Sequence, residues 1–262
     1  MRADKFFAEK FGSRTKAAEA LEKGWVLVGG KTLRPKDEVP EGAEIQFVED
    51  GSRFVSNGGY KLERAFERFA LDASGLVFVD IGASTGGFTD CLLQNNAQKV
   101  YAVDVGESQL HPKIAEDTRV VVMDGTNARF LAKSDFDVNI NGIVTDVSFI
   151  SLRLIFPVIA ELLHENGYAV TLIKPQFECE NKNIGKSGIV HTSAHLAIIQ
   201  KVIEYATECG LYLYDIVNAP IRKGKNVEYV ALWKKSVGGL KSYEVVMKIK
   251  ELLQKYSLSE LE

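Results

Sequence analysis

Four charged residues stand where a predicted sheet would bring them together. Asp146 closes the segment NGIVTDVSF and Lys174 closes AVTLIKPQFE, and both segments have the apolar pattern of buried strands. Glu228 begins the predicted strand VEYVALW, and Lys61 lies in the glycine-containing link SNGGYKL. If the strand after Glu228 runs antiparallel to the others, its start lies at the edge where the other two end. We therefore expect the four side chains to converge on one site.

Two lysines beside two carboxylates suit the removal of a proton from a weakly acidic hydroxyl. Such a step needs a base poised near the working pH, and we predict Lys174 for that role. The like charge of Lys61 favours a neutral amine there, whereas Asp146 orients the amine and favours its charged form. The sequence leaves open which effect is larger. Glu228 is expected to position Lys61 or the acceptor; for each residue alone, a surface ion pair is the alternative.

A glycine-rich turn, VDIGASTGGF, joins a predicted buried strand to a helix. Glycines at such a turn let the backbone bring a ligand against main-chain amides. The spacing is G-x-x-x-G-G rather than the G-x-G-x-x-G of dinucleotide sites. This pattern favours S-adenosylmethionine, because Asp80 can hold its cationic amino-acid end; a nicotinamide cofactor, or a turn without a ligand, is the alternative. The predicted cofactor residues here are Asp80, Gly82, Ala83, Ser84, Gly86, Gly87 and Phe88.

Acidic residues also end the next two predicted strands. Asp104, which is followed by Val105, is expected to accept hydrogen bonds from the ribose hydroxyls of the cofactor. Asp124 ends VVVMD and is expected to meet the adenine amino group. Acidic residues at three successive strand ends indicate a nucleoside cofactor at the carboxyl edge of the sheet. With S-adenosylmethionine there, the converging lysines and carboxylates predict methylation of a hydroxyl.

The segments that must position these residues alternate between strand and helix from about Leu76 onward. Near-continuous apolar strands separated by helices indicate a parallel sheet that is covered on both faces. Only the loop IRKGKN joins LYLYDIVNAP to VEYVALWKK, so the final strand is predicted to be antiparallel. SLRLIFPVIAELLHEN is predicted to be one helix despite its proline. The predicted fold class is therefore α/β, a Rossmann-like methyltransferase sheet with an antiparallel final strand.

A small α+β module is predicted to precede this sheet. Two short helices come before the hairpin WVLVGGKTL, whose turn is at Gly29-Gly30, and before the strand AEIQFVE. The whole chain has a net charge of −3, so binding to nucleic acid would need a local basic patch. Basic residues clearly outnumber acidic ones up to Lys36. The residues predicted to contact RNA phosphates are Arg2, Arg14, Lys16, Lys23 and Lys31.

The predicted organisation of the chain has four parts. Residues 1–56 form the basic module, 57–75 a glycine-containing linker and leading helix, 76–235 the methyltransferase domain, and 236–262 a C-terminal helical extension. Apolar stretches stay below the roughly 20 residues that cross a bilayer, and the amino terminus lacks the apolar core of a secretory signal. Three well-separated cysteines indicate buried thiols in a reducing cytoplasm, with neither a disulfide framework nor a metal site.

Several motifs in combination resemble the TlyA, or hemolysin A, family. They are FVSNGGYKLERA, DIGASTGGFTDCLL, YAVDVG, TDVSFISL, LIKPQFE and GKSGIVH. The methyltransferase half resembles FtsJ-type ribose 2′-O-methyltransferases, whose Lys-Asp-Lys-Glu tetrad falls on Lys61, Asp146, Lys174 and Glu228. The segment SRTKAAEALEKGWVLVGGK resembles the RNA-binding domain named after small-subunit ribosomal protein S-four. The resemblance implies 2′-O-methylation of cytidine in 23S ribosomal RNA, and in some members in 16S RNA as well, with ribosomal RNA or ribosomal subunits as partners.

Three departures from the family pattern concern the RNA contacts more than the tetrad. Asn57 stands where the link usually has an arginine, Gly29 stands where the hairpin usually has an asparagine, and Glu107-Ser108 follow the second acidic position. Three other functions stay open as alternatives: an RNA-binding protein without catalysis, a small-molecule methyltransferase and a membrane-damaging hemolysin. The intact tetrad argues against an RNA-binding protein without catalysis. The basic module argues against a small-molecule methyltransferase, and the lack of a signal segment argues against a hemolysin. The oligomeric state is left open.

Overall fold

The computed structural model describes residues 1–262 except 23–24, 48–52, 181–182, 186–187, 221–223 and 260–262. By their internal contacts, the residues divide into two compact units, Met1–Arg53 and Phe54–Glu262. The predicted linker and leading helix (57–75) and the C-terminal extension (236–262) both fall in the second unit, together with the predicted methyltransferase domain.

The first unit packs two helices against a small antiparallel sheet. Gly29 and Gly30 have φ values of 58° and 74° and form the two-residue turn of the predicted hairpin, which is confirmed. Ser13 Oγ accepts a hydrogen bond from the Lys16 amide at 3.2 Å and so begins the second helix. The elements are α1 (Ala3–Phe6), α2 (Arg14–Glu22), β1 (Val26–Val28), β2 (Lys31–Thr32) and β3 (Ile45–Phe47), with strand order β2-β1-β3.

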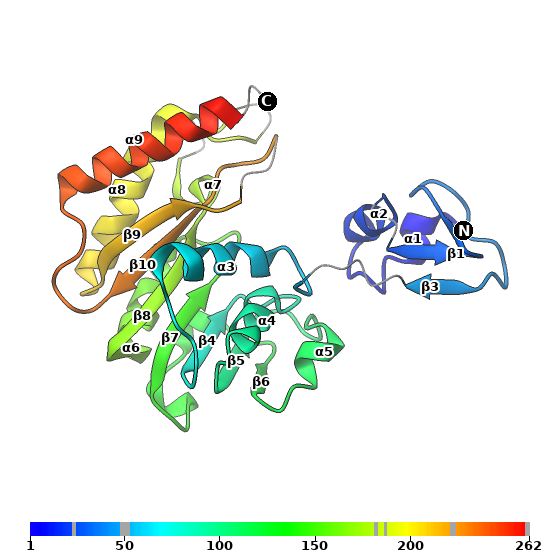
Figure 1. The fold of residues 1–262 in the computed structure, drawn as a ribbon, viewed down its shortest axis with the longest axis horizontal. Coiled ribbons are helices and arrows are strands. Elements are labelled where there is room, and N and C mark those ends of the chain that lie inside the picture. Colours follow the sequence, from blue (N-terminus) through cyan, green and yellow to red (C-terminus); the bar gives the residue numbers. More distant parts are fainter. Residues whose placement is uncertain (23–24, 48–52, 181–182, 186–187, 221–223, 260–262) are drawn as a thin grey trace. The chain divides into compact units, whose positions relative to one another are not determined.

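The second unit is built on a seven-stranded sheet in the order β6-β5-β4-β7-β8-β10-β9 (Figure 1). The strands from β4 to β8 pair in parallel, whereas β10 is antiparallel to both β8 and β9. The predicted fold class, a mostly parallel sheet with an antiparallel final strand, is thus confirmed. The strands are β4 (Val77–Ile81), β5 (Lys99–Val103), β6 (Val120–Met123), β7 (Ile140–Thr145), β8 (Leu163–Ile173), β9 (Tyr212–Asn218) and β10 (Tyr229–Lys234).

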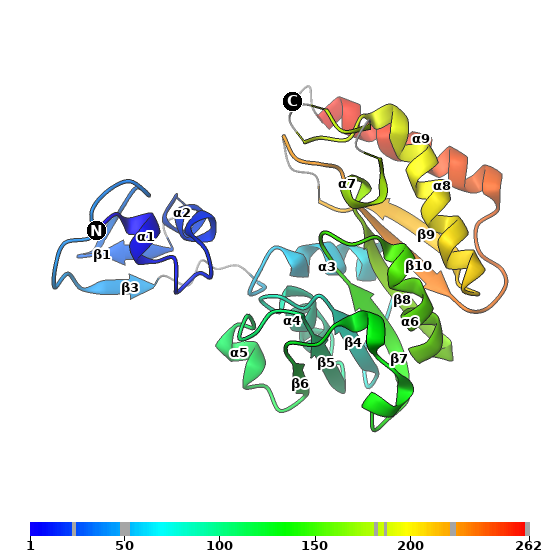
Figure 2. The same ribbon diagram turned by 180° about the vertical axis from the view of Figure 1, so that it is seen from behind.

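Helices cover both faces of this sheet, as comparison of Figures 1 and 2 shows. Side chains of α3, α4 and α5 pack against one face, and side chains of α6, α8 and α9 pack against the other. Each large apolar side chain that is fully buried this way stabilises the fold by roughly 1.5–3 kcal/mol. The helices are α3 (Gly58–Phe69), α4 (Gly87–Gln94), α5 (Pro112–Ala115), α6 (Phe156–Leu162), α7 (Pro175–Glu178), α8 (Thr192–Glu208) and α9 (Ser242–Ser259), with 3₁₀ turns η1 (Ala128–Phe130), η2 (Lys133–Asp135) and η3 (Leu152–Leu154).

The C-terminal helix α9 lies over the edge strand β9. Its buried residues Val245, Ile249 and Leu252 join the core, and the Asn218 side chain donates a hydrogen bond to the Leu252 carbonyl at 3.1 Å. Among the described residues, none of the helices is long and apolar enough to cross a membrane.

Two local predictions were wrong. The helix expected over 151–166 spans only Phe156–Leu162, and the residues from Leu163 onward belong to β8. Pro157 sits in the first turn of this helix, where its missing N–H is not needed, so the proline marks the start of the helix rather than its interior. The cysteines are free, but only Cys91 is buried; Cys179 and Cys209 are partly exposed.

Candidate active site

The four predicted charged residues form one connected cluster. Lys61 Nζ lies 3.3 Å from Asp146 Oδ2 and 2.7 Å from Glu228 Oε2. Lys174 Nζ lies 2.6 Å from Asp146 Oδ1. The carboxylate of Asp146 therefore stands between the two ammonium groups, and Glu228 holds Lys61 from the other side.

Sheet register explains this convergence. Thr145 pairs with Thr171 at the ends of β7 and β8, so Asp146 and Lys174 emerge at the same edge. Because β10 is antiparallel, its first residue, Tyr229, pairs with Ile173 at the end of β8, and Glu228 stands at that edge as well. Lys61 comes from the first turn of α3, which packs across β10.

The two lysines have different surroundings. Burial lowers the pKa of Lys61, but Asp146 and Glu228 together outweigh this effect and raise its pKa above the ordinary value, so Lys61 stays protonated. Lys174 is only 7% exposed, and its Nζ also donates a hydrogen bond to Ser148 Oγ at 2.8 Å. Sequence reasoning missed Ser148, although it stands two residues after Asp146 in the same loop.

An exposed aromatic ring borders the cluster. Phe149 is 90% exposed and has a φ of 63°, a strained backbone conformation for a bulky residue. Its ring lies 5.0 Å from that of Phe177, and Lys174 Nζ lies 5.9 Å from the same Phe177 ring. A solvent-facing aromatic side chain at such a position offers a surface on which an unstacked base can lie.

The glycine-rich turn fits the amino-acid end of S-adenosylmethionine. Asp80 is fully buried, and burial raises its pKa to about 7. Thr89 Oγ1 donates to Asp80 Oδ2 at 2.6 Å, while Oδ1 is buried and has no hydrogen-bond partner among the described residues. A buried carboxylate oxygen left in this state is stabilised by a cationic group. Gly82 and Gly86, with φ values of 83° and 90°, keep the turn tight.

The acidic residues at the next two strand ends shape the loops around this turn. Asp104 accepts hydrogen bonds from the Ser84 and Gly106 amides, both at 2.8 Å, and Asp124 accepts one from the Ser108 amide at 2.8 Å. Each carboxylate oxygen has further lone pairs, so these contacts still allow the predicted bonds to the nucleoside.

The remaining predicted cofactor residues lie in different surroundings. Ala83 is buried in the turn, whereas Val105 is 71% exposed beyond the end of β5. Phe88 is 3% exposed and packs in the core between α4 and α3, so its side chain supports the turn from behind. A Cβ atom on Gly87 would overlap Ser56 Oγ, which shows how closely the segment before α3 approaches the start of α4.

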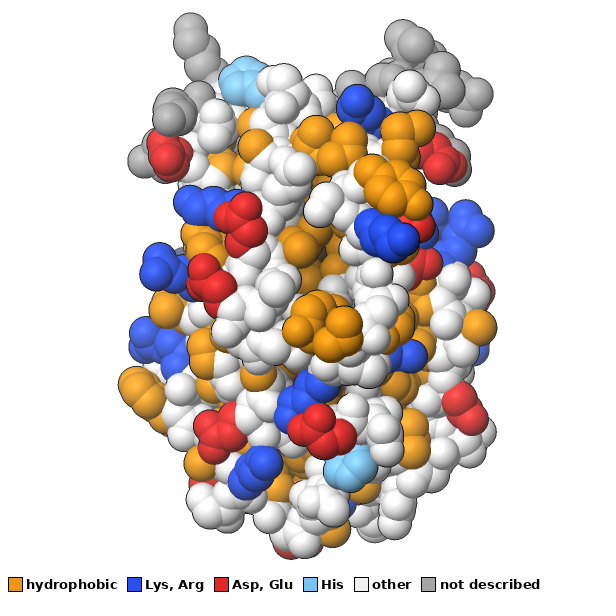
Figure 3. Space-filling model, turned by 90° about the vertical axis from the view of Figure 1, so that its left-hand side faces the viewer, with side chains coloured by type: hydrophobic (Ala, Val, Ile, Leu, Met, Phe, Trp, Pro, Cys, Tyr) orange, Lys and Arg blue, Asp and Glu red, His pale blue; other side chains and the backbone are white. Residues whose placement is uncertain are grey.

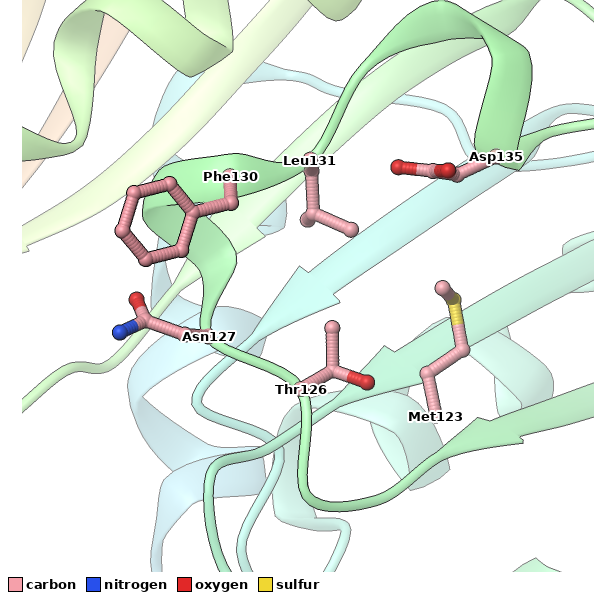
Figure 4. A pocket seen from close by; sticks show the side chains of 6 residues that line it. All are labelled: Met123, Thr126, Asn127, Phe130, Leu131 and Asp135. Carbon is pink, nitrogen blue, oxygen red and sulfur yellow. The ribbon is translucent and has the colours of Figure 1, made fainter.

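A shallow cavity of about 400 Å³ opens beside the end of β6 (Figure 4). Its walls come from the loop and 3₁₀ turns that follow Asp124, and Met123, Thr126 and Leu131 point toward a common space. It does not include the charged cluster of Lys61, Asp146, Lys174 and Glu228, which is partly exposed at the edge of the sheet.

In the first unit, the predicted RNA contacts divide into two groups. Arg2 and Arg14 both donate to Asp4 Oδ2 at 2.9 Å, and these bonds lower the pKa of Asp4 to about 2. Lys16 and Lys31 are exposed. Lys23 lies outside the described residues.

The sheet order, the glycine turn and the charged cluster define an S-adenosylmethionine-dependent methyltransferase. Residues 54–236 match the FtsJ-like methyltransferase family, and the chain belongs to that family. The predicted family membership is thus confirmed.

Relatives of this chain have names that mention RNA modification and haemolysis. Hemolysin A of Brachyspira hyodysenteriae is 40% identical over 223 residues, which cover 84% of this chain and 92% of that protein. The 16S/23S rRNA (cytidine-2'-O)-methyltransferase TlyA of Mycobacterium tuberculosis is 37% identical over 225 residues, which cover 84% of each chain.

Solved structures share the fold of this chain. A candidate hemolysin from Streptococcus thermophilus is similar over 100% of this chain and 98% of its own, with a TM-score of 0.79 and 34% identity. An S-adenosylmethionine dependent methyltransferase from Mesorhizobium loti is similar over 68% of this chain and 99% of its own, with a TM-score of 0.51 and 12% identity, so it shows the shared fold alone.

Proposed function

We propose that this chain methylates the 2′-hydroxyl of a cytidine in ribosomal RNA, on 23S RNA and also on 16S RNA. The observation that carries this proposal is the cluster of Lys61, Asp146, Lys174 and Glu228 at the sheet edge beside the glycine turn. The names of the TlyA relatives support the substrate. Ribosomal subunits are then the partners, and the cytoplasm is the place of action.

In this proposal Lys174 removes the proton from the attacking hydroxyl. When bound, S-adenosylmethionine supplies an electrophilic methyl group. Asp146 Oδ1, which lies 2.6 Å from Nζ of Lys174, and Ser148 Oγ, which accepts a hydrogen bond from it, orient the amine, and the lone pair of the unprotonated amine takes the hydroxyl proton. Lys61, held as a cation by Asp146 and Glu228, donates a hydrogen bond to the Asp146 carboxylate and orients it.

We further propose that the first unit binds RNA through Arg2, Arg14, Lys16, Lys23 and Lys31. Support comes from the exposed cations of this unit and from its predicted resemblance to the S-four domain. Phosphate contacts of this kind fix the position of the RNA, while contacts near the charged cluster select the nucleotide.

Methylation of ribosomal subunits that lack ribose modification tests the function directly. Labelled S-adenosylmethionine is incubated with wild type, with Lys174→Ala and with the exposed control Lys250→Ala on α9. We expect label in RNA with wild type and the control, and a loss of about 10²–10⁴-fold with Lys174→Ala, the range for removal of a general base.

Each contrary result has a separate meaning. No label in RNA with wild type would refute the proposed substrate. Full activity of Lys174→Ala would refute only the assignment of the base. If purified protein lysed red cells, and Lys174→Ala lysed them as well as wild type, the result would instead favour haemolysis, the function for which the Brachyspira relative is named.

A further inference from the structure

A further carboxylate, outside the predicted tetrad, lies on the helix that follows Lys174. Glu178 is the last residue of α7, the short helix that begins immediately after Lys174. Its Oε2 accepts a hydrogen bond from Ser151 Oγ at 2.6 Å, and its Oε1 accepts one from the Leu152 amide at 2.8 Å. Ser151 and Leu152 start the 3₁₀ turn η3 at the end of the loop that begins with Asp146.

Glu178 completes a series of contacts between two active-site loops. One loop follows β7 and carries Asp146, and the other follows β8 and carries Lys174. Going outward from the ion pair, Lys174 contacts Ser148, Phe177 contacts Phe149, and Glu178 contacts Ser151. The Glu178 contacts hold the outer end, beyond the strained and exposed Phe149.

Glu178 is suited to a fixed, directional link. Its carboxylate is largely shielded from water, and this burial raises its pKa despite the two hydrogen bonds that lower it. Hydrogen bonds to a shielded carboxylate are stronger than those on the surface. Both oxygens are used, one by a side chain and one by the main chain, so a single side chain ties the start of η3 to the end of α7 at two points.

We propose that Glu178 is a positioning residue for the reaction: it fixes the loop of Asp146 and Ser148 against the loop of Lys174, so that Nζ of Lys174 is aimed at the acceptor hydroxyl. This inference rests on the proposed function, in which Lys174 is the base. Glu178 touches neither the cofactor turn nor Lys174 itself, so its effect passes through the loop it holds.

Four variants test this role: Glu178→Ala, Glu178→Gln, the double variant with Lys174→Ala, and Glu161→Ala as a control carboxylate exposed on α6. We expect Glu178→Ala to lower kcat about 10–100-fold, by analogy with the loss seen when residues that orient metal ligands are removed, with the Kd for S-adenosylmethionine unchanged. Glu178→Gln should recover most of the activity, because an amide oxygen accepts from Leu152 and an amide N–H donates to Ser151. Glu161→Ala should match wild type.

The double variant separates positioning from a role in folding. If Glu178 acts through Lys174, Glu178→Ala adds little to the loss already caused by Lys174→Ala, so the two effects are not additive. Amide exchange at Leu152 should be faster in Glu178→Ala and normal in Glu178→Gln.

Three results would overturn the inference. They are an unchanged kcat in Glu178→Ala, a loss of activity that only follows the unfolded fraction, and fully additive losses in the double variant. An inactive wild type would instead refute the proposed function, so the two failures are distinguishable.

Discussion

Asp80 is fully buried, and one of its carboxylate oxygens has no hydrogen-bond partner in the described part of the chain. Substitution of Asp80 therefore tests the cofactor site. Its folded-state pKa of about 7 lies above the ordinary 3.8. Between about pH 4 and pH 7 the folded state therefore holds a proton that the unfolded state has lost, and the free energy of unfolding falls as pH rises through this window. A bound cation would offset that loss.

Asp80→Asn should remove this dependence and weaken the cofactor at the same time. We expect urea unfolding of the ligand-free variant to change less between pH 5 and pH 8 than that of wild type. Calorimetry should show at least about tenfold weaker binding of S-adenosylmethionine, because a charge-assisted contact is lost. Glu161→Gln, an exposed carboxyl, serves as the control. If the free energy of unfolding changed equally with pH in the variant and in wild type, the assignment of the raised pKa to Asp80 would be contradicted.

The residues of the site differ in how far the sequence predicts them. Asp146, Lys174 and Glu228 are predictable because strand ends fix where their side chains emerge. Lys61 comes from the first turn of α3, and it was predicted from its place in the glycine-containing link before the sheet. Ser148, Phe149 and Glu178 were not predicted, since their positions depend on loop conformation. Phe149 adopts a left-handed backbone conformation. Glycine or asparagine usually indicates such a conformation in a sequence, and a phenylalanine does not.

At the scale of elements, β10 and α8 are joined by a buried polar pair. His195 of α8 is 1% exposed, and its Nδ1 lies 2.7 Å from the hydroxyl of Tyr229, the residue after Glu228. On the other side of Glu228, the Asn226 side chain accepts from the Val190 amide at 2.8 Å and donates to the Gly188 carbonyl at 3.0 Å. These contacts hold the start of β10 against the segment that leads into α8.

Protonation of His195 should weaken this contact. Burial lowers its pKa below the ordinary 6.5, so below that pH the unfolded state binds a proton that the folded state does not. The contribution of His195 to stability is thus present above pH 6.5 and is lost as pH falls. In His195→Gln the melting temperature should fall less between pH 7 and pH 5 than in wild type, measured by differential scanning calorimetry. An equal fall in both proteins would show that another group is responsible.

Element boundaries also show what the sequence leaves undecided. The strand–helix alternation predicts the sheet and its antiparallel final strand, since loop length and apolar pattern suffice for both. The shortened helix Phe156–Leu162 was not predicted, because an apolar stretch such as IAELL suits a buried helix and a buried strand equally well. From Leu163 onward the chain forms a strand because its backbone pairs with β7.

At the scale of the whole molecule, the charge is nearly balanced. Figure 3 shows one face of the molecule, where lysines and arginines, acidic side chains and apolar side chains are interspersed. The net charge of −3 agrees with this mixture. The proposed RNA binding therefore requires local groups, and Arg2 and Arg14, which both donate to Asp4, are the proposed ones.

Arg14→Ala should weaken binding to ribosomal RNA and lower its salt dependence. Each phosphate contact contributes a slope of about 0.7–0.9 in the plot of log K against log salt, so the slope should fall by about 1. Filter binding of RNA at several salt concentrations measures this, with Lys250→Ala on α9 as the control. An unchanged slope would remove Arg14 from the proposed RNA contacts.

The reversed strand β10 also has a consequence for biosynthesis. β9 is made first, yet it lies at the edge of the sheet and pairs with β10, which separates it from β8. Until β10 has left the ribosome, the backbone N–H and C=O groups along the facing edges of β8 and β9 lack the strand with which they pair in the folded protein. The same event delivers Glu228 to Lys61, which precedes it by 167 residues. We therefore expect the nascent chain to pass through an inactive stage with unpaired strand edges, which ends when β10 closes the sheet and brings Glu228 into the charged cluster.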